Sequence, residues 1–148
     1  MSTPFVHLHL HSEYSLVDGC IRVKPLVNRV AEAGMPAVAV TDQSNLFAMV
    51  KFYRAAINAG VKPVIGVDIW VMPAESATKN QTEAEQQPTR LVLLCQNREG
   101  YLNLTRLITR SYIEGQHRGI PMVKKEWLRE ASDGLIALSA GRAGDVGQ

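Results

Sequence analysis

Apolar runs alternate with helix-like segments along the whole chain. Five apolar runs have the length and composition of buried strands, at residues 5–10, 36–42, 62–71, 90–96 and 134–140. The segments after the first two runs place apolar residues three or four positions apart and stop at Gly34 and Gly60, as helices do. Strands that are apolar almost throughout and are followed by helices predict an α/β fold with a parallel sheet covered by helices.

The helix expected at residues 45–60 has a recognisable start, stop and apolar stripe. Asn45 is a candidate cap at its start. The apolar positions at helical spacing are Leu46, Met49, Val50, Tyr53 and Ile57. These residues lie on one stripe of the expected helix.

The composition is that of an ordinary soluble globular protein, with 46% hydrophobic and 20% charged residues. The 148 residues predict one domain, residues 1–148, with a polar, mobile surface insertion at about residues 74–89. No apolar run approaches the roughly 20 residues that span a bilayer, and no signal peptide is recognisable. Two cysteines far apart favour a reduced, cytoplasmic protein with no membrane partner.

The net charge of +2 says little about partners, but residues 98–129 are rich in lysine and arginine. This segment is either a phosphate-facing surface or a solvated helix face, and the second interpretation is favoured. Direct contact of the segment with DNA is therefore retained only as an alternative hypothesis.

Three histidines stand at every second position near the start of the chain. In a strand, His7, His9 and His11 share one side, and Asp18 follows in the next loop. Imidazole and carboxylate ligands together suit zinc, manganese or iron, which activate water against phosphate esters. The alternative is a pair of hydrogen-bonded core histidines with a turn aspartate.

Further polar residues stand near the ends of the next two strands: Asp42 and Gln43 after one, and Asp68 late in the other. An open doubly wound sheet and a closed barrel both fit this rhythm, and the histidine face favours the barrel, whose chemistry gathers at strand ends. We expect Asp42 to be structural, bonding nearby backbone N–H groups, and His7 to be a barrel-face residue rather than a ligand.

Three stretches of the chain carry a family resemblance: "HLHLHSEYSLVDG", "AVAVTDQSNLFAMVKFYRAAINAGVKPVIGVDIWV" and "GLIALSAGRAGDVG". In the same order, they closely resemble the N-terminal PHP (polymerase and histidinol phosphatase) domain of bacterial DNA polymerase III alpha subunits. The resemblance runs from Phe5 to Gly147 and is weak only at residues 74–89. It implies that the chain is the N-terminal part of a distorted (β/α)7 barrel with parallel strands, whose family carries a trinuclear metal site at the strand ends.

The resemblance also implies seven ligand positions in this chain: His9, His11, Asp18, Gln43, Asp68, Arg90 and Gly141. The first three match, and Asp68 replaces a glutamate. A neutral amide, a guanidinium and a glycine occupy the other three and are poor or absent ligands. We therefore expect a vestigial site that holds no zinc or manganese cluster, and at most one weakly held ion at His9, His11 and Asp18. We also expect Arg90 to pair with Asp18 or Asp68 in place of the metal.

The functional implication is a segment of a replicative DNA polymerase, with no catalysis and no cofactor of its own. The parent chain would bind DNA and use Mg²⁺, through carboxylates far downstream. The segment would be a structural and docking module for the proofreading exonuclease (epsilon) subunit and other holoenzyme subunits. The alternative is a metal-dependent phosphoesterase or a PHP proofreading exonuclease. A truncated barrel is also expected to self-associate through the exposed strand "GLIALSA".

Overall fold

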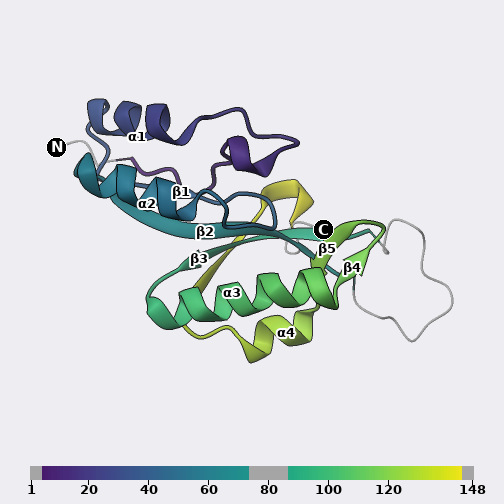
Figure 1. The fold of residues 1–148 in the computed structure, drawn as a ribbon. Helices are drawn as coiled ribbons and strands as arrows, with labels where there is room; N and C mark the ends of the chain where they lie inside the picture. The colour runs from purple at the N-terminus through teal and green to yellow at the C-terminus, as the bar shows by residue number, and fades with distance from the viewer. Residues whose placement is uncertain (1–4, 74–86, 145–148) are drawn as a thin grey trace, which may run out of the picture. The chain divides into compact units, whose positions relative to one another are not determined.

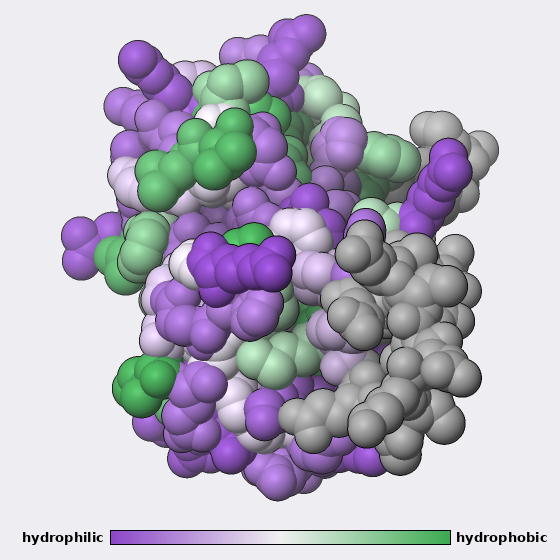
Figure 2. All heavy atoms as spheres, turned by 90° about the vertical axis from the view of Figure 1, so that its right-hand side faces the viewer, coloured by the Kyte–Doolittle hydropathy of each residue, from purple (hydrophilic) through white to green (hydrophobic). Residues whose placement is uncertain are grey.

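The computed structural model describes residues 5–73 and 87–144 and divides the chain into two compact units, Met1–Asp68 and Ile69–Gln148 (Figure 1). Most of the insertion expected at 74–89 lies outside the described residues. Hydrophilic side chains predominate on the face in Figure 2, and separate hydrophobic side chains stand out among them. Within the described residues no helix has the length and apolar character required to cross a membrane.

The first unit is built around a parallel strand pair. Its elements are a 3₁₀ turn at Glu13–Ser15, α1 (Val23–Glu32), β1 (Ala37–Val40), α2 (Met49–Asn58) and the greater part of β2 (Lys62–Val71). β1 and β2 pair in parallel, from Ala37 opposite Lys62 to Val40 opposite Ile65. This direction follows from the crossover through α2, since parallel neighbours need a long connection.

The histidine segment runs alongside β1 but makes only one bridge of strand type, between His7 and Val38. The backbone N–H of Ala39 donates to the carbonyl oxygen of His7, and the N–H of Thr41 donates to that of Leu10, both at 2.8 Å. The segment is thus extended, as predicted, although it is mostly exposed rather than buried.

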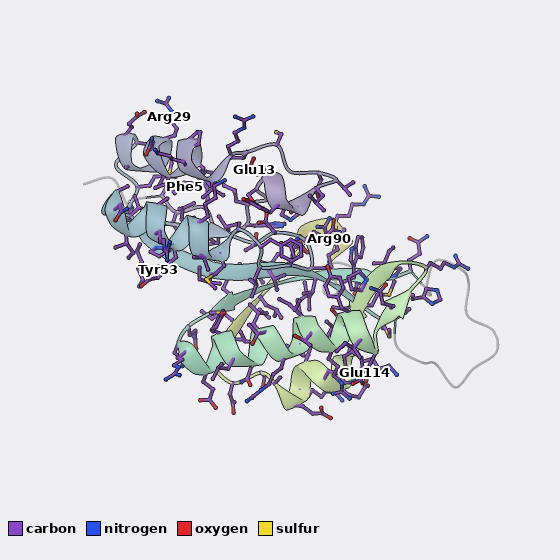
Figure 3. All side chains as sticks on the ribbon, in the orientation of Figure 1. Phe5, Glu13, Arg29, Tyr53, Arg90 and Glu114 are labelled. Atoms are coloured by element: carbon purple, nitrogen blue, oxygen red, sulfur yellow. The ribbon has the colours of Figure 1, made fainter. Side chains whose placement is uncertain are left out.

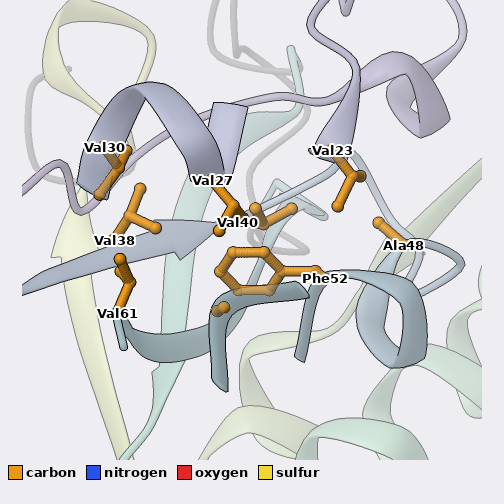
Figure 4. Close-up of a cluster of buried hydrophobic side chains, with 9 residues drawn as sticks. Val23, Val27, Val30, Val38, Val40, Ala48, Phe52 and Val61 are labelled. Carbon is orange, nitrogen blue, oxygen red and sulfur yellow. The ribbon is translucent and has the colours of Figure 1, made fainter. Parts of the chain in front are cut away.

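Side chains from both helices and from β1 form the core of the first unit (Figure 4). Its buried members are Val23, Val27, Val30, Val38, Val40, Ala48, Phe52, Ala56 and Val61. Phe52 is fully buried, and the small side chains of Ala48 and Ala56 beside it let α2 approach its neighbours closely.

The apolar stripe predicted for α2 is not the face that packs in the core. The helix begins at Met49, because Asn45 caps a preceding turn instead: its Oδ1 accepts the N–H of Phe47 at 3.0 Å. The buried face contains Phe52 and Ala56, whereas Val50, Tyr53 and Ile57 are exposed. Helical spacing could not choose between these faces, since both are apolar.

The second unit contains β3 (Thr89–Cys95), α3 (Arg98–Ile113), β4 (Gln116–His117), β5 (Ile120–Val123), α4 (Lys125–Glu130), β6 (Leu135–Ser139) and a 3₁₀ turn at Gly141–Ala143. The end of β2 pairs in parallel with β5, where Trp70 lies opposite Met122. β4 and β5 form an antiparallel hairpin.

The α/β class is confirmed, but the strands are not all parallel. β3 and β6 run antiparallel, with Leu91 opposite Ser139 and Cys95 opposite Leu135. The connection between them contains two helices and a hairpin rather than one crossover helix, so it can return the chain in either direction. The order of strands and helices along the sequence therefore does not determine whether β3 and β6 run parallel or antiparallel.

Candidate metal centre

His9, His11 and Asp68 lie together in the first unit. The Nε2 atoms of His9 and His11 are 2.8 Å and 3.2 Å from the same atom, Oδ2 of Asp68. The two imidazole rings are 5.2 Å apart between centroids. Asp68 is fully buried at the end of the parallel pair, as its late position in β2 predicted. Alternation along the extended segment thus directs both imidazoles at one carboxylate.

Asp18 completes this cluster through His11. Its Oδ1 lies 2.9 Å from Nδ1 of His11, so both nitrogens of that ring face carboxylates. The hydrogen bond with Asp68 is the largest cause that raises the pKa of His11 above its ordinary value of 6.5; burial opposes the change, and the contact with Asp18 adds to it. His11 is therefore favoured as an imidazolium that donates to both acids.

The residues present fit one metal ion better than a cluster of ions. One nitrogen of His9, one nitrogen of His11 and one oxygen of Asp68 lie within 4.8 Å of one another, and no other such group of histidine, cysteine or acidic residues occurs in 5–73 and 87–144. An ion held there must displace the imidazole protons that face Asp68, because only an unprotonated nitrogen coordinates a metal. In the present arrangement the imidazolium of His11 supplies positive charge beside Asp68, where a metal ion would otherwise supply it.

Gln43 lies beside the cluster but brings no charge to it. It forms a parallel bridge with Asp68, and its backbone N–H donates to Oγ of Ser15 at 2.9 Å. The backbone pairing therefore places Gln43 next to Asp68. Its neutral amide is a poor substitute for an imidazole ligand.

Arg90 and Gly141 lie in the second unit, and the antiparallel direction of β3 explains why they are near each other. Arg90 stands at the start of β3 and forms a bridge with Gly144, just after the 3₁₀ turn that contains Gly141. The guanidinium carbon of Arg90 is 5.0 Å from the ring centroid of Trp70, a cation–π contact that the sequence did not suggest. The pairing of Arg90 with Asp18 or Asp68 stays a prediction.

Asp42 is structural, as predicted, but its hydrogen bonds reach Ser12 and Ser15, 30 and 27 residues earlier, rather than nearby backbone N–H groups. Its Oδ1 accepts the backbone N–H of Ser12 at 2.6 Å and the hydroxyl of Ser15 at 3.2 Å, and its Oδ2 accepts the hydroxyl of Ser12 at 2.7 Å. The motif "SEYS" at 12–15 was the overlooked signal, because serine commonly caps a short helical turn. This network fixes the loop that ends in Asp18.

The remaining expectations concern residues outside the cluster. The ring of His7 meets the ring of Phe5 edge-on, with 4.7 Å between centroids. In the basic segment, Arg110 lies over Trp127 at 4.1 Å and bonds Glu114 at 3.0 Å and Glu130 at 3.1 Å. Intramolecular contacts thus occupy the guanidinium of Arg110, while DNA contact by residues 98–129 stays an untested alternative.

Comparison with known proteins identifies the family. A family model described as "PHP domain" matches residues 7–148. The chain is 52% identical over 148 residues to DNA polymerase III subunit alpha of Pseudomonas aeruginosa and 44% identical over 149 residues to that of Escherichia coli K12. These matches cover 99% and 100% of this chain but only 12% of each relative.

A solved structure supports the fold independently. An amidohydrolase from Chromobacterium violaceum, with bound sulfate and no metal, is similar over 72% of this chain and 32% of its own, with a TM-score of 0.51 and 20% sequence identity. This likeness concerns the fold alone. The family model over residues 7–148 and the identities of 44% and 52% confirm the resemblance seen in the sequence motifs. The chain belongs to the PHP domain family.

Proposed function

We propose that this chain is the N-terminal PHP region of a bacterial DNA polymerase III alpha subunit. The support is the identity of 44% to 52% over nearly the whole chain to proteins with that name, of which the chain spans 12%. The parent polypeptide would synthesise DNA on a template, with Mg²⁺ held by carboxylates outside these residues. It would act in the cytoplasm.

In this proposal the PHP region itself has no catalytic activity. The observation that carries it is the shared acceptor: the imidazoles of His9 and His11 both face Oδ2 of the buried Asp68. The raised pKa of His11, caused first by its hydrogen bond with Asp68, then favours an imidazolium rather than a metal ion beside that carboxylate. Gln43, Arg90 and Gly141 add no anionic or imidazole ligand for further ions. In this proposal the seven positions that correspond to metal ligands in the family stabilise the fold instead of binding a metal cluster.

The second part of the proposal is a docking role. A domain that no longer performs chemistry but stays attached to a polymerase can still hold other subunits, and we assign to it the proofreading exonuclease (epsilon) subunit. Other subunits of the holoenzyme would bind the parent chain. Sedimentation of the chain mixed with the purified exonuclease tests this: a faster-moving complex is expected, and independent sedimentation of the two proteins at micromolar concentrations would contradict it.

The metal content tests the loss of catalysis. The chain is incubated with zinc or manganese, dialysed and analysed for metal, and its hydrolysis of an aryl phosphate ester is measured. We expect at most one weakly held ion per chain and no metal-dependent turnover. His9→Gln is the matched variant, and any ion bound at the cluster should be lost from it.

The convergence of His9, His11 and Asp68 is also the observation that favours the alternative, a metal-dependent phosphoesterase or PHP proofreading exonuclease. That function needs two or more tightly bound ions to activate water and stabilise the leaving oxygen. Two ions per chain, with turnover that His9→Gln abolishes, would establish the alternative and refute the proposed loss of catalysis.

A further inference from the structure

α2 carries a second apolar face in addition to the one in the core. Val50, Tyr53 and Ile57 are 50% to 53% exposed, and their spacing of three and four residues places them along one side of the helix. Phe47, which is 67% exposed, lies in the turn just before the helix. We call these four residues the α2 outer face. In Figure 3 Tyr53 lies on the side of α2 opposite α1, with which α2 packs. Exposed apolar side chains that form a row usually mark a surface that another segment covers.

The helix that carries the α2 outer face contains basic residues and no acidic one. From Asn45 to Lys62 the sequence contains Lys51, Arg54 and Lys62 and no acidic residue. Lys51 is partly compensated by Glu13, whose Oε1 lies 3.3 Å from its Nζ. A segment that covers this face should therefore be apolar with acidic residues at its margin.

A second copy of the chain is a poor occupant of this face. In a twofold pairing the same patch lies on both sides, so the Lys51 and Arg54 side chains of one copy would approach those of the other. Like charges beside a desolvated contact oppose association. The charge pattern thus favours a segment of different sequence.

We propose that the α2 outer face is covered by a part of the same polypeptide that follows the PHP region, through an apolar segment with acidic flanks. This inference rests on the proposed function, because it requires the longer alpha-subunit chain. The relatives are long enough, since this chain spans only 12% of their length. A covalently linked segment is present at a high effective concentration and can cover the face permanently, which keeps four large apolar side chains out of water.

Cysteine labelling of the full-length alpha subunit tests the inference. Val50→Cys and Ile57→Cys are made separately, with Lys51→Cys as the matched control on the same helix. Val50 is 53% exposed and the side chain of Lys51 is 52% exposed, so the structure by itself predicts similar labelling for these two. Maleimide labelling at each site is followed by peptide mass spectrometry, natively and in denaturant, and DNA synthesis on a primed template is measured for each preparation.

The expected result is protection of positions 50 and 57 by about tenfold or more, because labelling must then await local opening, with no protection at position 51. Fast labelling at 50 and 57 in a preparation that synthesises DNA would overturn the inference and leave the proposed function intact. Protection that disappears on dilution would assign the face to a second copy, and protection that needs an added subunit would assign it to that subunit; both contradict the inference. A preparation without DNA synthesis counts against the proposed function instead.

Discussion

The Asp42 network offers the sharpest test of how this fold holds its functional loop. The carboxylate is buried and accepts three hydrogen bonds, from the N–H and hydroxyl of Ser12 and from the hydroxyl of Ser15. Asp42→Asn keeps the shape of the side chain while it removes the charge and replaces one acceptor with a donor. The substitution therefore isolates the electrostatic part of the network.

The magnitude follows from these three bonds. A hydrogen bond to a charged group contributes about 1.5–3 kcal/mol and a neutral one about 0.5–1.5 kcal/mol, so the variant loses about 1 kcal/mol at each of three bonds. A neutral amide costs less free energy to bury than a carboxylate, and this difference offsets part of the lost stability. We expect Asp42→Asn to lower the free energy of unfolding by about 2–3 kcal/mol and the melting temperature by roughly 5–10 °C.

The assay is urea unfolding at neutral pH, with the exposed Asp133→Asn as control, for which a change within about 0.5 kcal/mol is expected. A double-mutant cycle with Ser12→Ala should give a coupling energy of about 1 kcal/mol or more, because the two side chains are direct partners. A loss no larger than that of the control, or strictly additive losses in the cycle, would refute the reasoning.

Three further outcomes are expected. The hydrogen bond with Asp68 is the largest cause that raises the pKa of His11 in the folded protein. Protonated His11 therefore stabilises the fold fully below about pH 6.5, and this stabilisation is lost as the pH rises through the folded-state pKa of His11. Urea midpoints should therefore fall from about pH 6 to pH 9, less so in His11→Gln; equal slopes would disprove this. Gly19→Ala should unfold at lower urea, since its Cβ would overlap the carbonyl oxygen of Ser12, and an unchanged midpoint would show that the loop adapts freely. Light scattering should detect concentration-dependent self-association through β6, reduced in Ile136→Lys; a monodisperse monomer would contradict it.

The sequence by itself determined the local features of this protein. Period-two spacing placed His9 and His11 on one side of an extended segment, and the apolar run around Asp68 placed that residue late in a strand. The stops at Gly34 and Gly60 gave the limits of the first two helices to within a few residues, since both glycines adopt positive φ, at 68° and 70°. These features depend on residues close together in the chain.

Only the tertiary structure decided the features that depend on distant partners. The direction of β6 against β3 joins residues 40 or more positions apart, and the face of α2 that is buried depends on α1 and β1. The family resemblance placed His11, Asp18 and Asp68 at positions of a vestigial metal site, and the structure shows that each nitrogen of His11 faces one carboxylate. Spacing sets which way a side chain points, whereas the energy of packing and charge pairing between distant segments selects which atoms meet.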